Sequence, residues 1–503
     1  MDEPFSNDVK DLEDKDENKE QNKGQNKCLI IVLIVIIVIL IAGLGVLTFF
    51  YIKKNGKDKD KSKDNGKVDI KEDEEYFENR TILFKQPKET DPAKHILVHL
   101  PEKEIFMSTL HPAASLYEDV TDDIKVKECF DNLRKILKEK NIELITVRSA
   151  LKLNKTALKK LALQSLQYEI VQDNEFNTDS EEYKTFLKYT EDNYKKEVID
   201  KLSDDQLVDV VLNNPKYELM PTNMNTFIEP KSISFSPLGN LIFCRDQQIT
   251  TAKGVVIGRA HSSQRAGEHK IMKQVFDNIN ATVLGIVTKE YNENAYLEGG
   301  DFFVTKNNIS MLGVGLRTSI EGAEYLMEND FLGTRYLAII YDDEDLDQQR
   351  MHLDTYFNIL SDDYVIVLDF DEVQTHYKEK KIGRKVFLYD NQAEKSININ
   401  ESNIANDTNI PEECGNYKLV KVYEKFYTFL EENGYHLIKV THQQQVDYMI
   451  NFLNIGNNEI ISVNEKLKDV AKDSKTNILF LEFRPILNMY GAMHCITQVS
   501  RTD

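Results

Sequence analysis

From about Thr90 onward, short apolar runs alternate with amphipathic stretches, and this alternation limits the fold more than any other feature of the sequence. Runs such as "HILVHL" (95–100), "RYLAIIY" (335–341) and "TNILFLEF" (476–483) have the length and composition of buried strands. Stretches with helical spacing, such as 264–278 and 318–330, separate several of them. Strands mixed with helices exclude an all-α or an all-β fold, so we predict an α/β architecture.

Several other segments carry their own expectations. "IKVKECFDNLRKILKEKNIELITV" (124–147) predicts an amphipathic helix that runs into a strand. Residues 151–222 are rich in helix-forming residues and predict a helical insertion. We expect a strand over "NLIFCRD" (240–246) and a helix over 416–433. Residues 372–415 are polar and rich in asparagine, which predicts a long surface loop.

Composition excludes several classes of protein. A formal charge of -21 lacks the concentrated basic surface that nucleic-acid binding needs, so we expect no nucleic-acid partner. The five cysteines form no CxxC pair, which favours neither a zinc site nor a disulfide framework. They are Cys28, Cys129, Cys244, Cys414 and Cys495. This spacing fits a reducing compartment and leaves room for one reactive thiol.

An uncharged apolar run of 25 residues occupies residues 28–52. As a helix it would cross a hydrocarbon core of about 30 Å, and it is too long and begins too late for a cleaved signal peptide. We therefore predict a single transmembrane helix at 28–52, between a disordered charged tail (1–27) and a charged linker (53–89). Seven lysines in 53–67 against four in 13–27 predict a single-pass membrane protein whose C-terminal domain, 90–503, faces the cytosol.

Five short motifs could carry chemistry, although each has an ordinary structural explanation. "FCRDQQ" (243–248) could form a surface salt bridge, and "LEGGD" (297–301) could be a common tight turn. "MHLDT" (351–355), if it is a strand, places His352 and Asp354 on one face. Arg265 and Arg317 follow strand-like runs and could be plain surface residues. A buried cysteine such as Cys495 in "MHC" (493–495) is often inert.

Together these motifs match one kind of substrate. A planar guanidinium cation needs carboxylates around it, a soft nucleophile such as a thiolate to attack its carbon, and a histidine to protonate the departing nitrogen. If the substrate is an amino acid, arginine is the usual clamp for its carboxylate. The set therefore favours hydrolysis of a free guanidino amino acid.

In this order, the motifs "RD", "EGGD", "HLD" and a terminal "HC" resemble those of the arginine deiminases, members of the guanidine-modifying enzyme superfamily with the pentein fold. The resemblance extends from about residue 90 to the C-terminus. It implies a five-bladed, pseudo-symmetric α/β propeller with an inserted helical domain and an active site in the central channel. It implies no metal or organic cofactor.

The resemblance also implies a role for each residue that matches. Cys495 resembles the nucleophile, which forms a covalent amidino-thioether with the substrate carbon. His352 resembles the general acid and base, and Glu298 its partner. Asp246 and Asp354 resemble the carboxylates that hold the guanidinium. Six further residues match substrate-binding positions: Arg265, Arg317, Asn240, Phe243, Leu116 and Asp119.

The segment before Cys495 departs from the family pattern. Bacterial members typically carry an arginine and a glycine run here, whereas this chain reads "MYGAMHC" (489–495). Tyr490 stands at the position of that arginine, and Ala492 and Met493 replace glycines. Since the arginine belongs to a mobile loop that closes over the substrate carboxylate, we expect weaker binding or relaxed specificity.

The leading hypothesis is a membrane-anchored hydrolase that converts L-arginine to L-citrulline and ammonia. Two alternatives remain open at this point. One is a related guanidine-modifying enzyme, either a dimethylarginine hydrolase or an amidinotransferase. The other is a non-catalytic arginine-binding membrane protein. The sequence leaves the oligomeric state, including a homo-oligomer, open.

Overall fold

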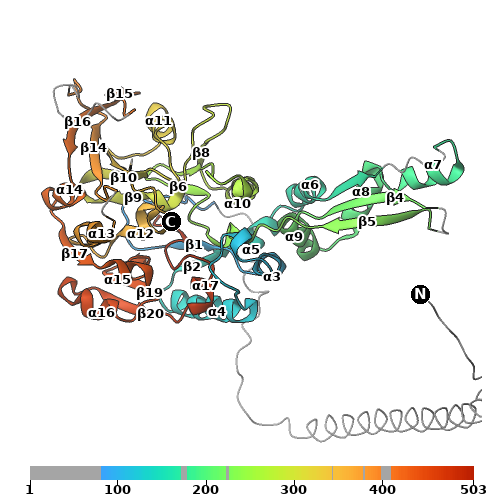
Figure 1. Ribbon diagram of the computed structural model, residues 1–503, viewed down its shortest axis with the longest axis horizontal. Helices are drawn as coiled ribbons and strands as arrows, with labels where there is room; N and C mark the ends of the chain where they lie inside the picture. Colours follow the sequence, from blue (N-terminus) through green and yellow to red (C-terminus); the bar gives the residue numbers. More distant parts are fainter. Residues whose placement is uncertain are drawn as a thin grey trace, which may run out of the picture. The chain divides into compact units, whose positions relative to one another are not determined.

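The computed structural model describes residues 81–171, 178–222, 226–342, 344–377, 380–397 and 409–502 (Figure 1). The predicted tail (1–27), the predicted transmembrane helix (28–52) and residues 53–80 of the predicted linker lie outside the described residues. Among the described helices, none has both the length and the apolar character needed to cross a membrane.

One small unit recurs in five of the sheets: two antiparallel strands followed by a third strand that lies parallel to the second. The units comprise β21 (Gln498–Ser500), β1 (His95–Val98) and β2 (Glu143–Thr146); β6 (Gln248–Thr250), β7 (Val255–Ile257) and β8 (Val283–Ile286); β9 (Phe302–Thr305), β10 (Ile309–Val314) and β11 (Tyr336–Tyr341); β12 (Phe357–Ile359), β13 (Tyr364–Leu368) and β17 (His436–Val440); and β18 (Leu453–Gly456), β19 (Glu459–Ser462) and β20 (Asn477–Phe480). Parallel strands need such crossover connections, and helices supply them. The crossover helices are α4 (Asp123–Glu139), α10 (Ala266–Asn278), α11 (Ile320–Glu328), α13 (Phe370–His376), α14 (Phe426–Glu432) and α16 (Leu467–Val470). The structure thus confirms the predicted mixed α/β fold.

The predicted helix and strand at 124–147 are present as α4 and β2. Helix α4 begins after Asp122, whose side chain accepts hydrogen bonds from the main-chain N–H groups of Ile124 and Lys125. Its buried face carries Val126, Cys129, Phe130, Leu133 and Leu137 at helical spacing.

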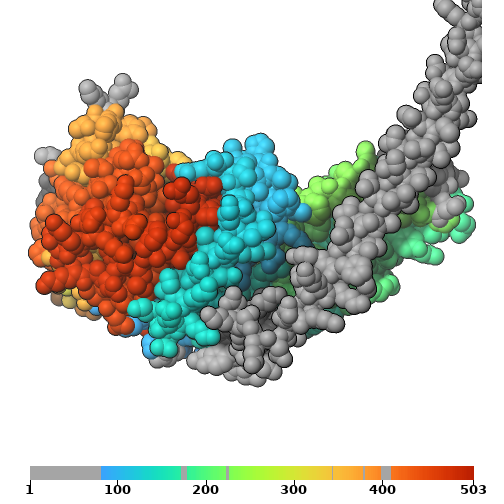
Figure 2. All heavy atoms as spheres, turned by 90° about the horizontal axis from the view of Figure 1, so that it is seen from below, coloured from blue at the N-terminus to red at the C-terminus, as the bar shows by residue number. Residues whose placement is uncertain are grey.

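The C-terminus completes the first sheet. Strand β21 pairs antiparallel with β1, with Ser500 opposite His95 and Gln498 opposite Leu97. Figure 2 shows C-terminal residues (red) against residues from the beginning of the described chain (blue to cyan). The end of this chain is therefore a buried structural element, which fixes the position of the residues just before it.

The third unit is larger than the others, and here one prediction is partly wrong. β14 (Lys385–Asp390), β16 (Tyr417–Tyr423) and β15 (Glu413–Cys414) extend it to six strands. The expected loop at 372–415 therefore contains two strands and the end of α13, while 378–379 and 398–408 lie outside the described residues. The helix expected over 416–433 begins as β16, because Tyr417, Leu419 and Tyr423 alternate toward the core in pairing with β14.

The insertion after α5 (Val147–Lys152) is not purely helical, so the prediction for 151–222 is wrong in part. It contains α6 (Lys155–Ser165), α7 (Glu181–Lys188), α8 (Asp192–Lys201) and α9 (Asp204–Asn213), together with a sheet of β3 (Gln167–Ile170), β4 (Lys216–Pro221) and β5 (Ile228–Ser234). Figure 1 shows α6, α8 and α9 beside these strands. Strand pairing overrides helix propensity here, and the insertion extends beyond residue 222.

Candidate active site

The predicted catalytic residues share one position in the repeated unit. Asp246, Glu298, Asp354 and Cys495 lie two to four residues before the first strands of their units, which are β6, β9, β12 and β21. The loops that lead into these strands converge, so side chains as far apart in sequence as Asp246 and Cys495 line one cavity. Since the strands are fixed by their sheets, the loops hold these side chains on a rigid framework.

Cys495 is buried, with 7% of its surface exposed. Its Sγ lies 3.6 Å from Oδ2 of Asp354 and accepts a hydrogen bond from Nδ2 of Asn451 at 3.0 Å. Burial, followed by the negative charges of Asp354 and Asp246, raises the pKa of the Cys495 thiol well above its ordinary value. The thiol is therefore protonated at neutral pH until a cation enters the site and offsets the two carboxylates.

His352 lies at the N-cap of the short helix α12 (Leu353–Tyr356), not on a strand as predicted. Its Nε2 lies 2.9 Å from Oε2 of Glu298, and its Nδ1 lies 4.0 Å from Oδ1 of Asp246. Burial alone would lower the pKa of His352, but Asp246, Asp301 and Glu298 together raise it to about 9. His352 therefore carries a proton at neutral pH.

Glu298 is the matching anion. Burial disfavours its charged form, yet the bond to His352 and the charges of Arg265 and Arg317 lower its pKa to about 2. Its other oxygen, Oε1, accepts a hydrogen bond from the main-chain N–H of His261 at 3.0 Å. Because these partners lower its pKa, Glu298 stays charged at neutral pH although it is fully buried, and its bond to Nε2 fixes the orientation of the His352 ring.

The "EGGD" turn is a 3-10 helix, Gly299–Asp301, and both glycines are required by close contacts. A Cβ on Gly299 would lie 2.0 Å from the carbonyl oxygen of Arg245, and one on Gly300 would lie 2.7 Å from Nδ1 of His352. Asp301 accepts hydrogen bonds from the Thr318 hydroxyl (2.7 Å) and the Leu353 N–H (2.9 Å). Asp301 therefore supports the His352 loop rather than pointing at a substrate.

Asp246 and Asp354 each keep one oxygen free. Oδ2 of Asp246 pairs with Nη1 of Arg265 at 2.7 Å, and Oδ2 of Asp354 accepts a hydrogen bond from Nδ1 of His494 at 2.7 Å. The Oδ1 atoms of both aspartates are buried and have no hydrogen-bond partner within the described part of the chain. Two such acceptors on residues near Cys495 suit the N–H groups of a planar cation.

The two predicted arginine clamps differ. Arg265 is buried and its guanidinium already contacts Asp246, Glu268 (2.9 Å) and the carbonyl of Asn240 (3.2 Å). Arg317 donates from Nη2 to Gln348 at 3.0 Å, while its Nε has no partner among the described residues. Arg317 is therefore the better placed of the two to bind an additional anion.

Two small cavities meet at Cys495. The first has a volume of about 30 Å³ and is lined by Leu116, Asn240, Phe243, Asp246, Arg265, Arg317, Gln348, Met351, His352, Met489, Tyr490 and Cys495. It contains five of the six predicted binding residues. The exception is Asp119, which is exposed and whose side chain accepts the Val120 N–H. "NLIF" (240–243) is also not a strand, because a 3-10 helix, Gly239–Ile242, turns Asn240 and Phe243 toward the cavity.

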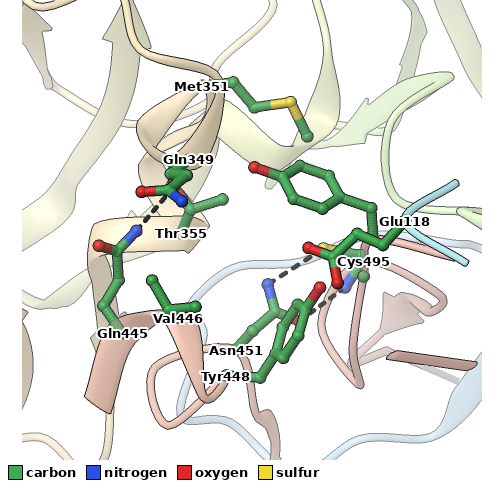
Figure 3. Close-up of a pocket in the computed structure, with 11 residues that line it drawn as sticks. Glu118, Gln349, Met351, Thr355, Gln445, Val446, Tyr448, Asn451 and Cys495 are labelled. Atoms are coloured by element: carbon green, nitrogen blue, oxygen red, sulfur yellow. Dashed lines mark hydrogen bonds between the residues drawn. The ribbon is translucent and has the colours of Figure 1, made fainter. Parts of the chain in front are cut away.

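The second cavity, of about 50 Å³, is drawn in Figure 3 and shares Met351, Tyr490 and Cys495 with the first. Glu118, the neighbour of Asp119, lines it together with Tyr448 and Asn451. The main-chain N–H groups of Glu118 and Asp119 donate to the carbonyl of Asn488 at 2.9 and 3.0 Å. The loop at 116–119 is thus tied to the segment that carries Tyr490.

The prediction missed Asn451 and His494. Asn451 contacts Cys495 directly, and His494 holds Asp354. The signal for Asn451 was its place two residues before β18, which corresponds to the places of the other site residues. That signal becomes visible only once the repeat is recognised.

Asp246, Glu298 and His352 offer ligand atoms within 4.8 Å of one another, a spacing that could hold a metal ion. Each of the three already has a partner in the protein. Arg265 pairs with Asp246 at 2.7 Å and lies 4.0 Å from Glu298, and Glu298 binds His352. The guanidinium of Arg265 already supplies a positive charge to this cluster.

Comparison with known proteins agrees with this geometry. The family model "Arginine deiminase" matches residues 115–501. Arginine deiminase 1 of Staphylococcus epidermidis is 24% identical over 332 residues, which cover 63% of this chain and 75% of that protein. The arginine deiminase of Oenococcus oeni is 25% identical over 301 residues, covering 54% and 66% of the two chains.

Two solved structures are also similar to this chain. A dimethylarginine dimethylaminohydrolase is 10% identical with a TM-score of 0.41, covering 81% of this chain and 99% of that one. The N-terminal domain of ArgZ, a cyanobacterial arginine dihydrolase, is 15% identical with a TM-score of 0.43, covering 80% and 97%.

A buried cysteine, a charged histidine–glutamate pair and two aspartates with free oxygens define a hydrolase that acts on a guanidinium group. The family match makes this class specific: the chain belongs to the arginine deiminase family. It is an arginine deiminase-type enzyme, as the sequence motifs predicted.

Proposed function

We propose that this enzyme hydrolyses L-arginine to L-citrulline and ammonia through a covalent intermediate on Cys495. One observation carries the proposal: Cys495 shares a cavity with Asp246 and a protonated His352, its Sγ lies 3.6 Å from Asp354, and each aspartate keeps one buried oxygen without a partner among the described residues. The two free oxygens accept N–H groups of the guanidinium through charge-assisted hydrogen bonds. Arg317, with its free Nε, binds the substrate carboxylate. Arg265 holds Asp246 in position through their salt bridge.

The first half of the reaction releases ammonia. The bound cation offsets the charges of Asp246 and Asp354, so the thiol of Cys495 loses its proton to solvent and the thiolate attacks the guanidinium carbon. His352 then gives its proton to one terminal nitrogen, and the C–N bond breaks with departure of NH₃. The product is a thiouronium in which Sγ is bonded to the former guanidinium carbon.

The second half uses the same histidine in reverse. His352, now neutral, takes a proton from water as the water oxygen bonds to the thiouronium carbon. The C–S bond then breaks and the electron pair returns to sulfur, while the remaining hydroxyl proton is lost to solvent as the carbonyl forms, so neutral citrulline is released with Cys495 as thiolate. Glu298 stabilises the charged form of His352 in both halves, since it remains an anion throughout.

A citrulline assay tests the proposal directly. The purified full-length chain should form citrulline and ammonia in equal amounts from millimolar arginine, and Cys495→Ala should form neither. Cys244→Ala, which removes another fully buried thiol, is the matched control and should retain activity. Absence of citrulline from the wild-type chain across pH 5–9 would contradict the proposal.

We further propose that the five repeated units are the blades of a pseudo-symmetric α/β propeller with the active site at its centre. Two observations support this arrangement. Site residues precede the first strand of several units, and the last strand, β21, pairs with the first, β1.

We also propose that residues 28–52 anchor the enzyme in a membrane and that residues 90–503 lie in the cytosol. The support is the uncharged run itself and the excess of lysines after it. The full-length chain should stay in the membrane pellet after alkaline carbonate washing, and a chain that lacks 28–52 should not. Recovery of both in the soluble fraction would contradict the anchor.

A further inference from the structure

We propose that Asn451 is a catalytic residue of this site: its side-chain amide stabilises the sulfur of Cys495 as a thiolate and fixes the direction from which that sulfur attacks. The step it assists belongs to the proposed arginine hydrolysis, but the contact with sulfur does not depend on the identity of the substrate. No motif in the sequence pointed to this residue.

The repeat singles out Asn451. Four of the five units place a site residue two to four residues before their first strand: Asp246, Glu298, Asp354 and Cys495. In the remaining unit, whose first strand is β18, the residue at this place is Asn451, two residues before Leu453. The five units therefore contribute one side chain each, and four of the five already have a role in the chemistry.

The hydrogen bonds of Asn451 fix the orientation of its amide. Oδ1 accepts the main-chain N–H groups of His494 (3.0 Å) and Cys495 (3.3 Å). Nδ2 donates to Sγ of Cys495 (3.0 Å) and to the carbonyl of Asp354 (3.3 Å). The opposite orientation would place the NH₂ group against two N–H donors, so Nδ2 must face the sulfur (Figure 3).

The Nδ2 donor of Asn451 favours the thiolate form of Cys495, whereas the neighbouring carboxylates disfavour it. Asp354, 3.6 Å away, and Asp246 disfavour a thiolate, as does burial. Tyr448 lines the second cavity together with Cys495, and Arg245 and the protonated His352 are cations near Cys495. His494 is engaged with Asp354, so it does not donate to Sγ.

The sulfur is anionic at two points of the proposed cycle, when it attacks and when it leaves the thiouronium carbon. A donor at 3.0 Å stabilises the anion at both points, whereas the substrate cation offsets the carboxylates only while it is bound. By binding two successive N–H groups, Oδ1 also keeps the Cys495 main chain from rotating. Asn451 thus acts on both the ionisation and the aim of the nucleophile.

The test measures alkylation of Cys495 by iodoacetamide in the full-length chain between pH 7 and 10, read by mass spectrometry on the peptide that contains residue 495. Asn451→Asp keeps the shape and the acceptor for both N–H groups but places a carboxylate against the sulfur. We expect about a hundredfold slower alkylation at pH 8. Asn451→Ala removes the donor without adding charge, and we expect about tenfold slower alkylation, since one unit of pKa is a tenfold change in thiolate.

Asn454→Ala is the matched control. Asn454 is buried and lies in β18, where, among the described residues, its side chain bonds to main-chain groups of Ile359, Leu360 and Gly456 and to no side chain. We expect its Cys495 alkylation rate to stay within twofold of wild type. If Asn451→Asp fails to fold, Asn451→Ala carries the test, because it introduces no buried charge.

Wild-type alkylation rates and pH dependence in a folded Asn451 variant would overturn the inference. A shifted alkylation profile in the Asn451 variants, with no citrulline formed by the wild-type chain, would support the role at sulfur and defeat only the proposed function. Citrulline formation by the wild-type chain, with unchanged alkylation in the Asn451 variants, would support the proposed function and overturn the role of Asn451.

Discussion

The active site contains two buried histidines, each bonded to a carboxylate, yet the pKa values of the two histidines are shifted in opposite directions. His352 lies 2.9 Å from Glu298, and His494 lies 2.7 Å from Asp354. The pKa of His352 is raised to about 9, whereas that of His494 is lowered. A single short bond to a carboxylate therefore does not decide whether a buried histidine is charged.

The groups beyond the bonded carboxylate make the difference. Burial opposes the charged form of both rings. Around His352, Asp246 and Asp301 add negative charge to that of Glu298 and outweigh burial. Around His494, the guanidinium of Arg245 adds to the effect of burial. His494 also stacks on Phe303, with ring centroids 4.9 Å apart.

Because their charges differ, the two histidines suit different roles. His352 holds a mobile proton next to the cavity, which suits an acid and base. His494 is neutral, does not line either cavity, and holds Asp354 in place through Nδ1. In the proposed mechanism the second histidine only positions Asp354, even though it stands directly beside the proposed nucleophile in sequence.

The largest expected effect comes from removing the charge that sustains His352. Glu298→Gln keeps the shape of the side chain but removes the anion, so the pKa of His352 should fall toward its ordinary value. We expect kcat for citrulline formation to drop by about 10²–10⁴, the usual contribution of general acid–base catalysis. The pH profile of kcat checks the cause, since its alkaline limb should move to lower pH.

Glu104→Gln is the matched control for that change. Glu104 forms a second fully buried glutamate–histidine pair, with Oε1 2.9 Å from Nε2 of His99, but lines neither cavity at Cys495. It should leave the pH profile of kcat unchanged. An equal loss of kcat in both variants would show that stability, not the charge on His352, explains the effect.

The same contrast predicts how stability depends on pH. Because the pKa of His352 is raised from 6.5 to about 9, its stabilising contribution is complete below pH 6.5 and is lost as pH rises through about 9. Glu298, lowered from 4.5 to about 2, contributes above pH 4.5 and loses its contribution as pH falls through about 2. The pair should be most stabilising between these limits.

Denaturant unfolding at pH 6 and pH 9.5 measures the alkaline side of this dependence. The free energy of unfolding of the wild-type chain should fall by up to about 3 kcal/mol from His352, since one pKa unit is worth about 1.4 kcal/mol. His352→Gln should flatten that fall, whereas His494→Gln should not, because the pKa of His494 is lowered. Equal flattening by both variants would contradict the contrast.

A smaller effect is expected at His494 itself. His494→Asn can still donate a hydrogen bond from near the position of Nδ1, so Asp354 should keep its orientation. We expect kcat/KM to fall about tenfold or less, with the pH profile unchanged, because no proton passes through this residue. His494→Ala, which frees Asp354, should be the more damaging of the two. A shift of the alkaline limb in His494→Asn would mean that the charge, not the position, of His494 matters.

Sequence alone was enough for the class of fold, and it named most of the residues that the structure brings together near Cys495. Core strands such as β11 and β13 are apolar runs, and "EGGD" and "HLD" are local motifs whose residues stay together in space. The predicted catalytic set of Cys495, His352, Glu298, Asp246 and Asp354 gathers around the cavities at Cys495, and its roles stay predictions until assayed.

The parts that were mispredicted depend on contacts between distant segments. The strands of the insertion and β16 exist because they pair with partners elsewhere, which local propensity does not reveal. Glu118 rather than Asp119 lines a cavity because the loop is tied to the carbonyl of Asn488, far along the chain. Asn451 was missed because an isolated asparagine before a strand carries no motif.

The smallest expected effect concerns Tyr490, on the same segment as Cys495 and His494. Burial, followed by the charge of Glu118, raises the pKa of Tyr490 to about 12, so its hydroxyl is neutral at working pH and cannot supply the charge of the family's arginine. Tyr490→Arg would add a cation near Arg317, on the wall that Tyr490 shares between the two cavities. Because partly exposed ion pairs are worth about 1 kcal/mol or less, we expect KM for arginine to fall by about fivefold at most, with kcat little changed.

Tyr490→Phe is the control for that gain, since it removes only the hydroxyl, and we expect KM within twofold of wild type. The backbone should tolerate both changes, because Tyr490 already has a φ of 70° and neither substitution adds a β-branch. Glu118 sets the limit on the gain, since it can pair with the new guanidinium and withdraw it from the substrate. If Tyr490→Arg leaves KM unchanged but Tyr490→Arg combined with Glu118→Gln lowers it, that competition is the reason. If neither variant lowers KM, the segment before Cys495 does not approach the substrate carboxylate, and Arg317 binds that carboxylate without help from residue 490.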